Sequence, residues 1–500
     1  MKNHLPMTLK ILCFILLLTN VVHAQVTVSW YNYPGGVAVA TNNSLDVYSV
    51  NWDYNPGGDI TLTKRDSSGN ILWEAAFDNT DNTRFEVSTW VDIDSNGDIF
   101  VSGTIRSGIS NPVDAASVLM KFSSSGALLW RSVFENAFDG SSTRKLLIDS
   151  DDNIYVFGIG AGPTGHVTKV KKFDTAGSPL WSYYDTLGIG SPVNIKFTPD
   201  SNLLIITRTT SGNLNGFLKI DLNGNEIWSA TGFSSNTVGD ASGDAFGNTY
   251  LINGEYVITN SGSVLQKISP AGTFLWADTN AITAFRAETG TDNNPVICGF
   301  PNSGTPGASF IKYDSSGNIL WQNLDADGPA YALLLHAQMK LDATNAAYLA
   351  AGTLTQMAIC KINSDGSTGW TAVVPGSYAN SFDFTTGSVI YVTGGTTAKL
   401  EQSLSTQINT ENTTINANQI LVSPNPLQSL ASINYSINER TISSLSIVDV
   451  LGNIQTKLST NDHHPGENVM IVDLSELKPG IYFCKLISGE LTLYTKFIKT

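Results

Sequence analysis

Charged residues are scarce in this chain. Lys, Arg, Asp and Glu make up 14% of its 500 residues, against about 25% in ordinary soluble domains. Acidic residues outnumber basic ones by 43 to 28, so the net charge is −15. A surface with this excess of negative charge repels phosphate groups. Nucleic acids and anionic membranes are therefore not expected as partners.

Long apolar runs are also few. Ile11–Leu18 is an apolar run of eight residues, too short for a transmembrane helix, which takes about 20 residues. The run follows two lysines and precedes small residues. Residues 1–24 are therefore predicted to be a secretory signal peptide, cleaved between Ala24 and Gln25. A retained anchor is the alternative, and no later stretch resembles a transmembrane span.

Cysteines and histidines are rare beyond the signal. Cys298, Cys360 and Cys484 are too few and too far apart for a disulfide framework. Each stands in an apolar segment, which predicts a small buried side chain. The four remaining histidines have no metal-ligand spacing: His166, His336, His463 and His464. No metal site and no cofactor are predicted.

A repeat organises residues 25–400. Gly-x-x-x-Trp occurs seven times, and in each copy a Lys lies five residues before the Gly. The copies are Gly69–Trp73, Gly126–Trp130, Gly177–Trp181, Gly224–Trp228, Gly272–Trp276, Gly317–Trp321 and Gly366–Trp370. Asp, Ser, Asn and Gly between the Lys and the Trp predict a tight turn between two strands. A second hairpin motif, such as Asp94–Gly103, recurs between these copies, which gives four strands in each unit of about 45–50 residues, the size of a propeller blade.

The ends of the repeat predict how a ring would close. The last unit has a third strand with Lys399 in register, but Leu404 stands where its Gly should fall and no Trp follows. The N-terminal strand around Trp30 resembles the missing fourth strand. Pairing the two would close the ring and remove two exposed edges. The expected fold is all-β, with an eight-bladed β-propeller; seven blades is the alternative.

The repeats resemble two related families. The Asp-Ser-x-Gly-Asn-x-Tyr-Val-x-Gly copies resemble the bacterial β-propeller repeat of many secreted proteins. The Gly-x-x-x-Trp strands resemble the tryptophan-docking repeats of pyrroloquinoline-quinone-type propellers, which have eight blades. The resemblance covers about three quarters of the chain and implies architecture rather than activity. The tryptophans assigned a structural role in the repeat are Trp30, Trp73, Trp130, Trp181, Trp228, Trp276, Trp321 and Trp370.

The last hundred residues differ from the repeat. Residues 401–418 are rich in Asn, Thr, Ser and Gln and are predicted to be a linker. Short alternating strands in 419–500 predict a small Ig-like β-sandwich. The motifs of this region come in the order Val422-Ser-Pro-Asn-Pro426, Asp449-Val-Leu-Gly-Asn453, Val472-Asp-Leu-Ser475, Leu477-Lys-Pro-Gly-Ile-Tyr482 and Lys496-Phe-Ile-Lys499.

Those motifs resemble the type A sorting domains of the type IX secretion system of Bacteroidetes-type bacteria. The resemblance implies passage through the periplasm and export to the outer-membrane cell surface or the medium. It also implies two partners, the secretion machinery and a surface sortase, and attachment to surface lipopolysaccharide or release. An ordinary accessory sandwich is the alternative.

Motifs for catalysis are absent from the sequence. It contains no Gly-x-Ser-x-Gly, Walker or zinc-protease pattern. Asp92-Ile-Asp94-Ser-Asn96-Gly97 begins like a calcium loop, but Gly103 stands where an EF-hand needs a carboxylate, so turn chemistry is favoured over calcium. No catalytic residue is predicted.

Four residues are weak candidates for ligand binding. Trp90 lies outside the Gly-x-x-x-Trp register, and it shares the longest segment between units with Arg84 and Phe85. His336 follows an apolar run that enters a predicted inner strand. An exposed aromatic on a propeller would suit sugar or peptide stacking, although packing in the core is favoured for Trp90.

The leading hypothesis is a non-enzymatic module that binds a glycan or a protein at the cell surface. The first alternative is an enzyme, either a quinone-dependent dehydrogenase or a polysaccharide lyase or glycosidase. The second is a structural surface protein or one associated with gliding. Fold alone does not choose among them.

Overall fold

A computed structural model describes two compact units, Gln25–Ser403 and a C-terminal unit whose described residues begin at Ile420. The described residues are 25–52, 58–78, 84–106, 115–134, 142–162, 165–185, 191–208, 214–234, 239–253, 264–279, 282–301, 307–326, 337–384, 389–403, 420–423, 425, 427, 430–437, 441–450, 452–463, 466–488 and 491–499. The predicted signal peptide and His336 lie outside them. All regular elements within these ranges are strands, and none of the described residues forms a helix that could cross a membrane.

The described residues of the first unit form eight four-stranded antiparallel sheets. The first sheet contains β2 (Ala38–Thr41), β3 (Val47–Trp52), β4 (Ile60–Arg65) and β5 (Ile71–Phe77), and the second contains β6 (Phe85–Ile93), β7 (Ile99–Arg106), β8 (Ala116–Phe122) and β9 (Leu128–Phe134). The third sheet contains β10 (Ser142–Ile148), β11 (Ile154–Gly162), β12 (Gly165–Phe173) and β13 (Pro179–Tyr184), and the fourth contains β14 (Ser191–Thr198), β15 (Asn202–Arg208), β16 (Leu214–Asp221) and β17 (Glu226–Ser234). The fifth sheet contains β18 (Asp240–Gly243), β19 (Thr249–Asn253), β20 (Val264–Ile268) and β21 (Phe274–Thr279), and the sixth contains β22 (Ile282–Thr289), β23 (Pro295–Pro301), β24 (Ala308–Tyr313) and β25 (Ile319–Ala326). The seventh sheet contains β26 (Gln338–Leu341), β27 (Ala347–Gly352), β28 (Gln356–Ile362) and β29 (Thr368–Pro375), and the eighth contains β30 (Ala379–Phe384), β31 (Val389–Gly394), β32 (Thr397–Ser403) and β1 (Gln25–Asn32).

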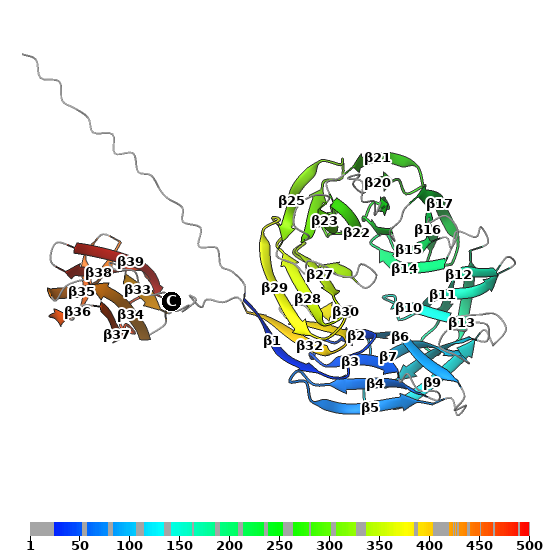
Figure 1. The fold of residues 1–500 in the computed structure, drawn as a ribbon, viewed down its shortest axis with the longest axis horizontal. Helices are drawn as coiled ribbons and strands as arrows, with labels where there is room; N and C mark the ends of the chain where they lie inside the picture. Colours follow the sequence, from blue (N-terminus) through cyan, green and yellow to red (C-terminus); the bar gives the residue numbers. More distant parts are fainter. Residues whose placement is uncertain are drawn as a thin grey trace, which may run out of the picture. The chain divides into compact units, whose positions relative to one another are not determined.

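The sheets form a ring (Figure 1). The first strand of each sheet contacts the first strands of the sheets before and after it, and β30 contacts β2, so the series closes. These eight first strands surround the centre of the ring. The arrangement is propeller-like.

The last sheet joins the two ends of this unit. β1 pairs antiparallel with β32, with Trp30 opposite Lys399. The predicted pairing of the N-terminal strand with the last repeat is confirmed. Because β32 extends to Ser403, the residues 401–403 that the sequence assigned to a linker belong to a strand.

A local turn explains why each repeat folds as a hairpin. In the turn before Trp73, the Asp66 carboxylate accepts hydrogen bonds from the backbone N–H groups of Ser68 (2.8 Å) and Asn70 (2.9 Å). The Gly69 N–H donates to the Asp66 carbonyl over 3.0 Å, and Gly69 has a φ of +87°. Side chains rarely tolerate that conformation, which is one reason for the repeated glycine.

Tryptophan docking between sheets gives the second reason. The Trp73 indole lies against the turn of the next sheet, where a Cβ added to Gly126 would come within 2.8 Å of its ring. Its Nε1 donates to the Ser124 carbonyl of the same turn. Six indoles make this bond to a backbone carbonyl two residues before the glycine: Trp30, Trp73, Trp130, Trp181, Trp276 and Trp321. Trp370 contacts no such glycine turn among the described residues and donates to Gln402 Oε1 over 3.1 Å.

The repeated lysines lie inside the sheets rather than at a site. Lys121 pairs with Asp94 (3.1 Å) and Asp98 (3.0 Å), and its ammonium lies 5.0 Å from the Phe100 ring centre. Lys219 is 1% exposed and pairs with Asp200 over 2.7 Å. These lysines tie a turn to the strand beside it, which is a structural task.

The C-terminal unit contains two sheets around one hydrophobic core. One sheet has the order β33 (Ile420–Ser423), β34 (Leu430–Ile437) and β37 (Gly466–Asp473). The other has the order β36 (Ile454–His463), β35 (Thr441–Asp449), β38 (Gly480–Ser488) and β39 (Leu491–Lys499). Ile433 of the first sheet and Ile447 and Leu486 of the second belong to the same buried cluster. All three described cysteines are free and buried, as predicted.

Candidate binding site

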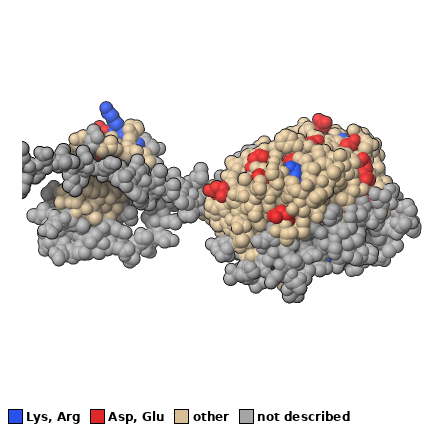
Figure 2. All heavy atoms as spheres, turned by 90° about the horizontal axis from the view of Figure 1, so that it is seen from above, with Lys and Arg blue, Asp and Glu red and all other residues tan. Residues whose placement is uncertain are grey.

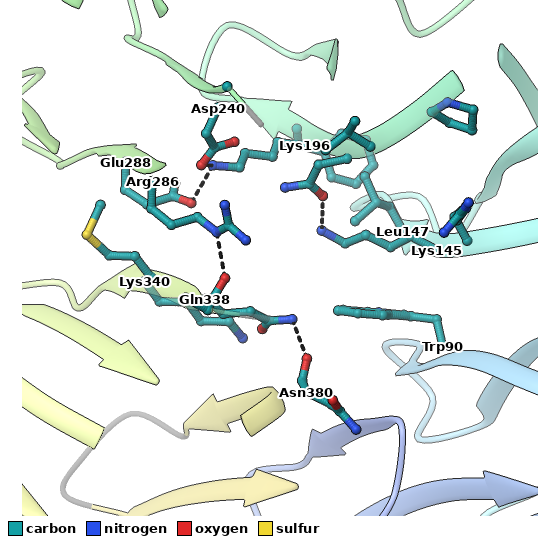
Figure 3. A pocket seen from close by; sticks show the side chains of 18 residues that line it. Trp90, Lys145, Leu147, Lys196, Asp240, Arg286, Glu288, Gln338, Lys340 and Asn380 are labelled. Carbon is teal, nitrogen blue, oxygen red and sulfur yellow. Dashed lines mark hydrogen bonds and ion pairs between the residues drawn. The ribbon is translucent and has the colours of Figure 1, made fainter. Parts of the chain in front are cut away.

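A cavity of about 540 Å³ lies at the centre of the ring. Its lining comes from the first strands of seven sheets or the residue before them, from β6 round to β30. Figure 3 shows Trp90, Lys145 and Lys196 on one side and Arg286, Gln338 and Lys340 on the other, all directed toward the centre. The volume lies within the range of about 300–1,000 Å³ that small-molecule sites occupy.

Strand periodicity directs these side chains into the cavity. Val91, Leu146 and Ile195 of the first strands are buried among the sheets, at 1%, 0% and 0% exposure. Residues on either side of them must face the opposite way, because side chains alternate along a strand. Four of the first strands also have a β-bulge just before a cavity-lining residue, at Thr89, Arg144, Val193 and Phe285, and in β30 the bulge residue Asn380 lines the cavity itself. A bulge changes the direction of the next side chain, and bulges are common beside functional sites.

The cavity has the opposite charge to the protein. Five cations line it against two carboxylates, and the seven residues are Arg144, Lys145, Lys196, Arg286, Lys340, Asp240 and Glu288. Figure 2 shows Asp and Glu scattered over one face of the molecule, with few Lys or Arg among the described residues there. A positive cavity in an acidic protein favours a negatively charged ligand.

One lysine crosses between three sheets. Lys196 Nζ lies 2.9 Å from Asp240 and 2.7 Å from Glu288, and it donates to the Ala287 carbonyl. Burial opposes the charge on Lys196, but the two carboxylates outweigh it and raise its pKa. Burial raises the pKa of Glu288 despite the attraction of Lys196. This network neutralises one of the five cations.

Lys145 and Trp90 form a second group. Lys145 Nζ lies 5.0 Å from the Trp90 ring centre and donates to Asn194 Oδ1 and to the Ile195 carbonyl, both over 3.1 Å. Its partners are neutral, and burial together with the neighbouring Lys196 lowers the pKa of Lys145 to about 8. Lys145 is therefore an ammonium close to releasing its proton at neutral pH.

The remaining cations are held by backbone or paired at the margin. Arg286 donates from Nε to the Ala337 carbonyl and from Nη1 to the Phe285 carbonyl, both over 2.6 Å. Lys340 pairs with Asp383 over 2.8 Å. Arg144 is exposed to the cavity and has no ion pair with any residue that the structure describes.

The sequence identified one residue of this cavity. Trp90 lines it, while part of its ring packs against two hydrophobic clusters. Phe85 is 9% exposed and, like Arg84, does not line the cavity. His336 lies outside the described residues. The binding roles of all four stay predictions.

Sequence analysis missed the charged residues of the cavity. Lys145, Lys196 and Arg286 each lie in the first strand of a repeat, next to a residue that is buried. A comparison of first strands would have shown polar residues at alternate positions. These polar residues do not form a motif, because their identity differs from repeat to repeat.

The structure gives the acidic loop at Asp94 a turn geometry. The Asp94 carboxylate accepts hydrogen bonds from the backbone N–H groups of Asn96 (3.0 Å) and Asp98 (2.8 Å). Lys121 forms ion pairs with the carboxylates of Asp94 and Asp98. No group of three or more His, Cys, Asp or Glu side chains suited to a metal ion occurs among the described residues.

Comparison with known proteins identifies the C-terminal unit. Residues 421–500 match the family model of the secretion system C-terminal sorting domain. The predicted sorting domain is confirmed, and it marks the chain for the type IX secretion system and for export to the cell surface or the medium. No curated protein matches the chain.

Solved structures are only distantly similar. A protein of unknown function from Bacteroides caccae is 13% identical, with a TM-score of 0.34 over 66% of this chain and 93% of the other. PorZ, a surface component of the type IX secretion system of Porphyromonas gingivalis, is 10% identical, with a TM-score of 0.32 over 93% and 81%. A fungal alcohol oxidase in complex with copper is 14% identical, with a TM-score of 0.36 over 95% and 100%. Scores this low carry no argument about this chain.

Proposed function

We propose that this protein is a non-enzymatic, eight-bladed β-propeller that binds a saccharide in its central cavity at the cell surface. The observation that carries the proposal is the lining of the cavity. Trp90 supplies apolar ring surface, and the amides of Asn194, Gln338 and Asn380 surround it. A sugar ring offers both apolar C–H faces and hydroxyls, so it requires this combination.

The finer architecture belongs to the same proposal. The docking of seven indoles on the glycine turn of a neighbouring sheet supports repeats of the tryptophan-docking type and a count of eight blades. The two sheets around one core support an Ig-like sandwich in 419–500. A signal peptide at 1–24, removal of the sorting domain by a sortase and attachment to lipopolysaccharide complete the expected route to the surface.

Binding of defined oligosaccharides to the intact chain tests the proposal. Trp90→Ala should weaken binding at least tenfold, which corresponds to about 1.4 kcal/mol. Phe246→Ala is the matched control, because Phe246 is an aromatic residue that is 71% exposed and lies outside the cavity lining. Trp90→Phe keeps an aromatic ring and should retain most of the affinity. The proposal fails if no saccharide binds, or if the Trp90 and Phe246 variants behave alike.

A polysaccharide lyase is the second candidate, and Lys145 is the observation in its favour. A general base works best with a pKa near the operating pH, and the pKa of Lys145 is about 8. Uronate polymers should then yield unsaturated ends that absorb ultraviolet light, and Lys145→Ala should abolish them. Absence of such products would leave the binding function. Nothing in the described residues favours the dehydrogenase, glycosidase or structural alternatives.

A further inference from the structure

A second cavity adjoins the first one. It has a volume of about 680 Å³ and shares two lining residues, Arg144 and Asn380, with the central cavity. Its remaining walls come from β3, β6, β7 and β10 and from the segments beside β2 and β30. The two cavities are therefore neighbours, with Arg144 and Asn380 lining both.

Two arginines dominate the charge of this second cavity. Arg106 and Arg144 are its only charged lining residues, and no carboxylate lines it within the described part of the chain. Neither guanidinium makes an ion pair with a described residue. The surrounding protein displaces water and lowers the pKa of both, although Arg144 keeps contact with solvent through the cavity. A guanidinium stays charged in proteins. Two unpaired cations in one cavity are unusual in a chain with 43 acidic residues.

Buried polar atoms here also lack partners. Arg106 Nε is buried and has no hydrogen-bond acceptor. The Ser88 hydroxyl is also buried and has no hydrogen-bond partner, and Ser88 is 2% exposed. An unpaired buried polar group is costly and calls for an explanation. Both residues line the second cavity. An anion bound there would accept from Arg106 and from Ser88 and would remove this cost.

Aromatic and hydroxyl groups complete the lining. Trp52 and Tyr378 supply flat apolar surface. The hydroxyl groups of Thr89 and Thr143 form a hydrogen bond of 2.9 Å with each other. Rings and hydroxyls suit a sugar, while the guanidinium fork suits a planar carboxylate or a sulfate. An acidic peptide would not require the aromatic walls.

We propose that the second cavity binds the acid group of an acidic saccharide, held by Arg106 and Arg144, while the neighbouring sugar unit lies in the central cavity against Trp90. This inference rests on the proposed function and names its ligand class. The shared chemistry is a negatively charged sugar, either a uronate with a carboxylate or a sulfated sugar. The ligand spans at least two sugar units.

The experiment uses the intact chain, poly-glutamate as an acidic peptide, and three sets of oligosaccharides of equal length: oligogalacturonate, a sulfated galactan and neutral galactan. The double variant Arg106→Gln with Arg144→Gln should bind the preferred acidic set at least about tenfold more weakly, because a hydrogen bond to a charged group is lost at each site. Double replacement by Lys should restore part of the affinity, since the charge remains without the bidentate fork. The carboxylated and sulfated sets tell which acid is bound.

Arg131→Gln is the matched control. It removes one guanidinium from β9, where Arg131 lies over the Phe77 ring outside both cavities, and it should leave binding unchanged. Thermal unfolding of the double variant should occur at no lower temperature than that of the parent, because neither arginine has an ion pair with a described residue to lose and Arg106 Nε has no hydrogen-bond partner there. Binding of the acidic set should also weaken as salt rises.

Three outcomes overturn the inference, and they separate it from the proposed function. If neutral and acidic sugars bind equally and the arginine variants have no effect, the acid site is wrong and the saccharide site stands. If no saccharide binds, both fail. If poly-glutamate binds more tightly than every saccharide, the cavity is a peptide site. The inference is supported if the arginine double variant binds the acidic oligosaccharides more weakly while the Arg131→Gln variant binds them as the parent does.

Discussion

The outer turns and the central cavity of the first unit follow opposite rules. At the outer turns, the same Gly and Trp recur from sheet to sheet and make the same contact. In the cavity, equivalent positions of successive first strands are occupied by different residues, among them Trp90, Lys145, Asn194, Asp240, Arg286 and Gln338. A residue that every sheet needs stabilises the sheet. A position that varies while the backbone stays the same is free to serve a ligand.

The largest expected effect comes from breaking a repeated contact. Trp321→Ala should lower the free energy of unfolding by about 3–4 kcal/mol, because the indole packs against a hydrophobic cluster and donates to the Ser364 carbonyl over 2.9 Å. Saccharide binding at a temperature where the protein stays folded should not change. Urea unfolding followed by tryptophan fluorescence measures this unit alone, since all ten tryptophans lie within Gln25–Ser403. Leu320→Ala is the control, because Leu320 is 51% exposed.

Removing a buried lysine should come next. Lys219→Met leaves the Asp200 carboxylate without its cation and should destabilise this unit by about 2–3 kcal/mol at pH 7. Burial opposes the charge on Asp200, but Lys219, Thr198 and Asn202 outweigh it and lower its pKa. A lowered carboxyl pKa stabilises the fold above the unfolded value, and that stability is lost as pH falls through the folded value. The difference between parent and variant should therefore shrink below about pH 4.

The two reasons for the repeated glycine can be separated within one sheet. Gly126 and Gly97 have similar φ angles, +90° and +82°, but a Cβ on Gly126 would meet Trp73 while one on Gly97 would meet nothing within 4 Å. Both changes to Ala should cost about 1–2 kcal/mol for the left-handed conformation. Gly126→Ala should cost about 1–2 kcal/mol more, because the indole must move. Equal losses in urea unfolding would show that docking contributes nothing.

Sequence reasoning succeeded where the signal was local and repeated. The turn residues from Asp66 to Trp73 lie within eight positions, so a single repeat contains the whole hairpin. The cavity is assembled from strands tens to hundreds of residues apart, and its members share no motif. Trp90 was found because it broke the register of the repeat. Lys145 and Arg286 could not be predicted as cavity residues, because a single cation in a strand indicates a site only when the ring places it beside residues from the other six strands.

The smallest expected effect concerns a carboxylate of the inner strands. Asp92 lies two positions after Trp90 on β6, and burial raises its pKa to about 6, with Asp383 adding to the rise. The unfolded value is about 3.9, so the folded state holds the proton more tightly. Ionisation therefore destabilises the fold as pH rises from about 4 to 6, and the cost is constant above that.

Asp92→Asn removes that cost, since an amide does not ionise and its oxygen can still accept the Ile93 N–H bond of 2.9 Å. A rise of about two pKa units corresponds to at most about 3 kcal/mol, and because the Asp92 side chain is only partly buried, solvent screening should reduce the effect to about 1 kcal/mol. The variant should therefore be more stable than the parent by about that amount at pH 8 and about equal to it at pH 4. Asp151→Asn is the control, because it makes the same replacement at an exposed turn. An equal gain at both pH values for Asp92→Asn would exclude the buried charge as its cause. A gain confined to high pH would show that the inner strands keep a charged group that destabilises the fold, in contrast to the repeated docking contacts, which stabilise it.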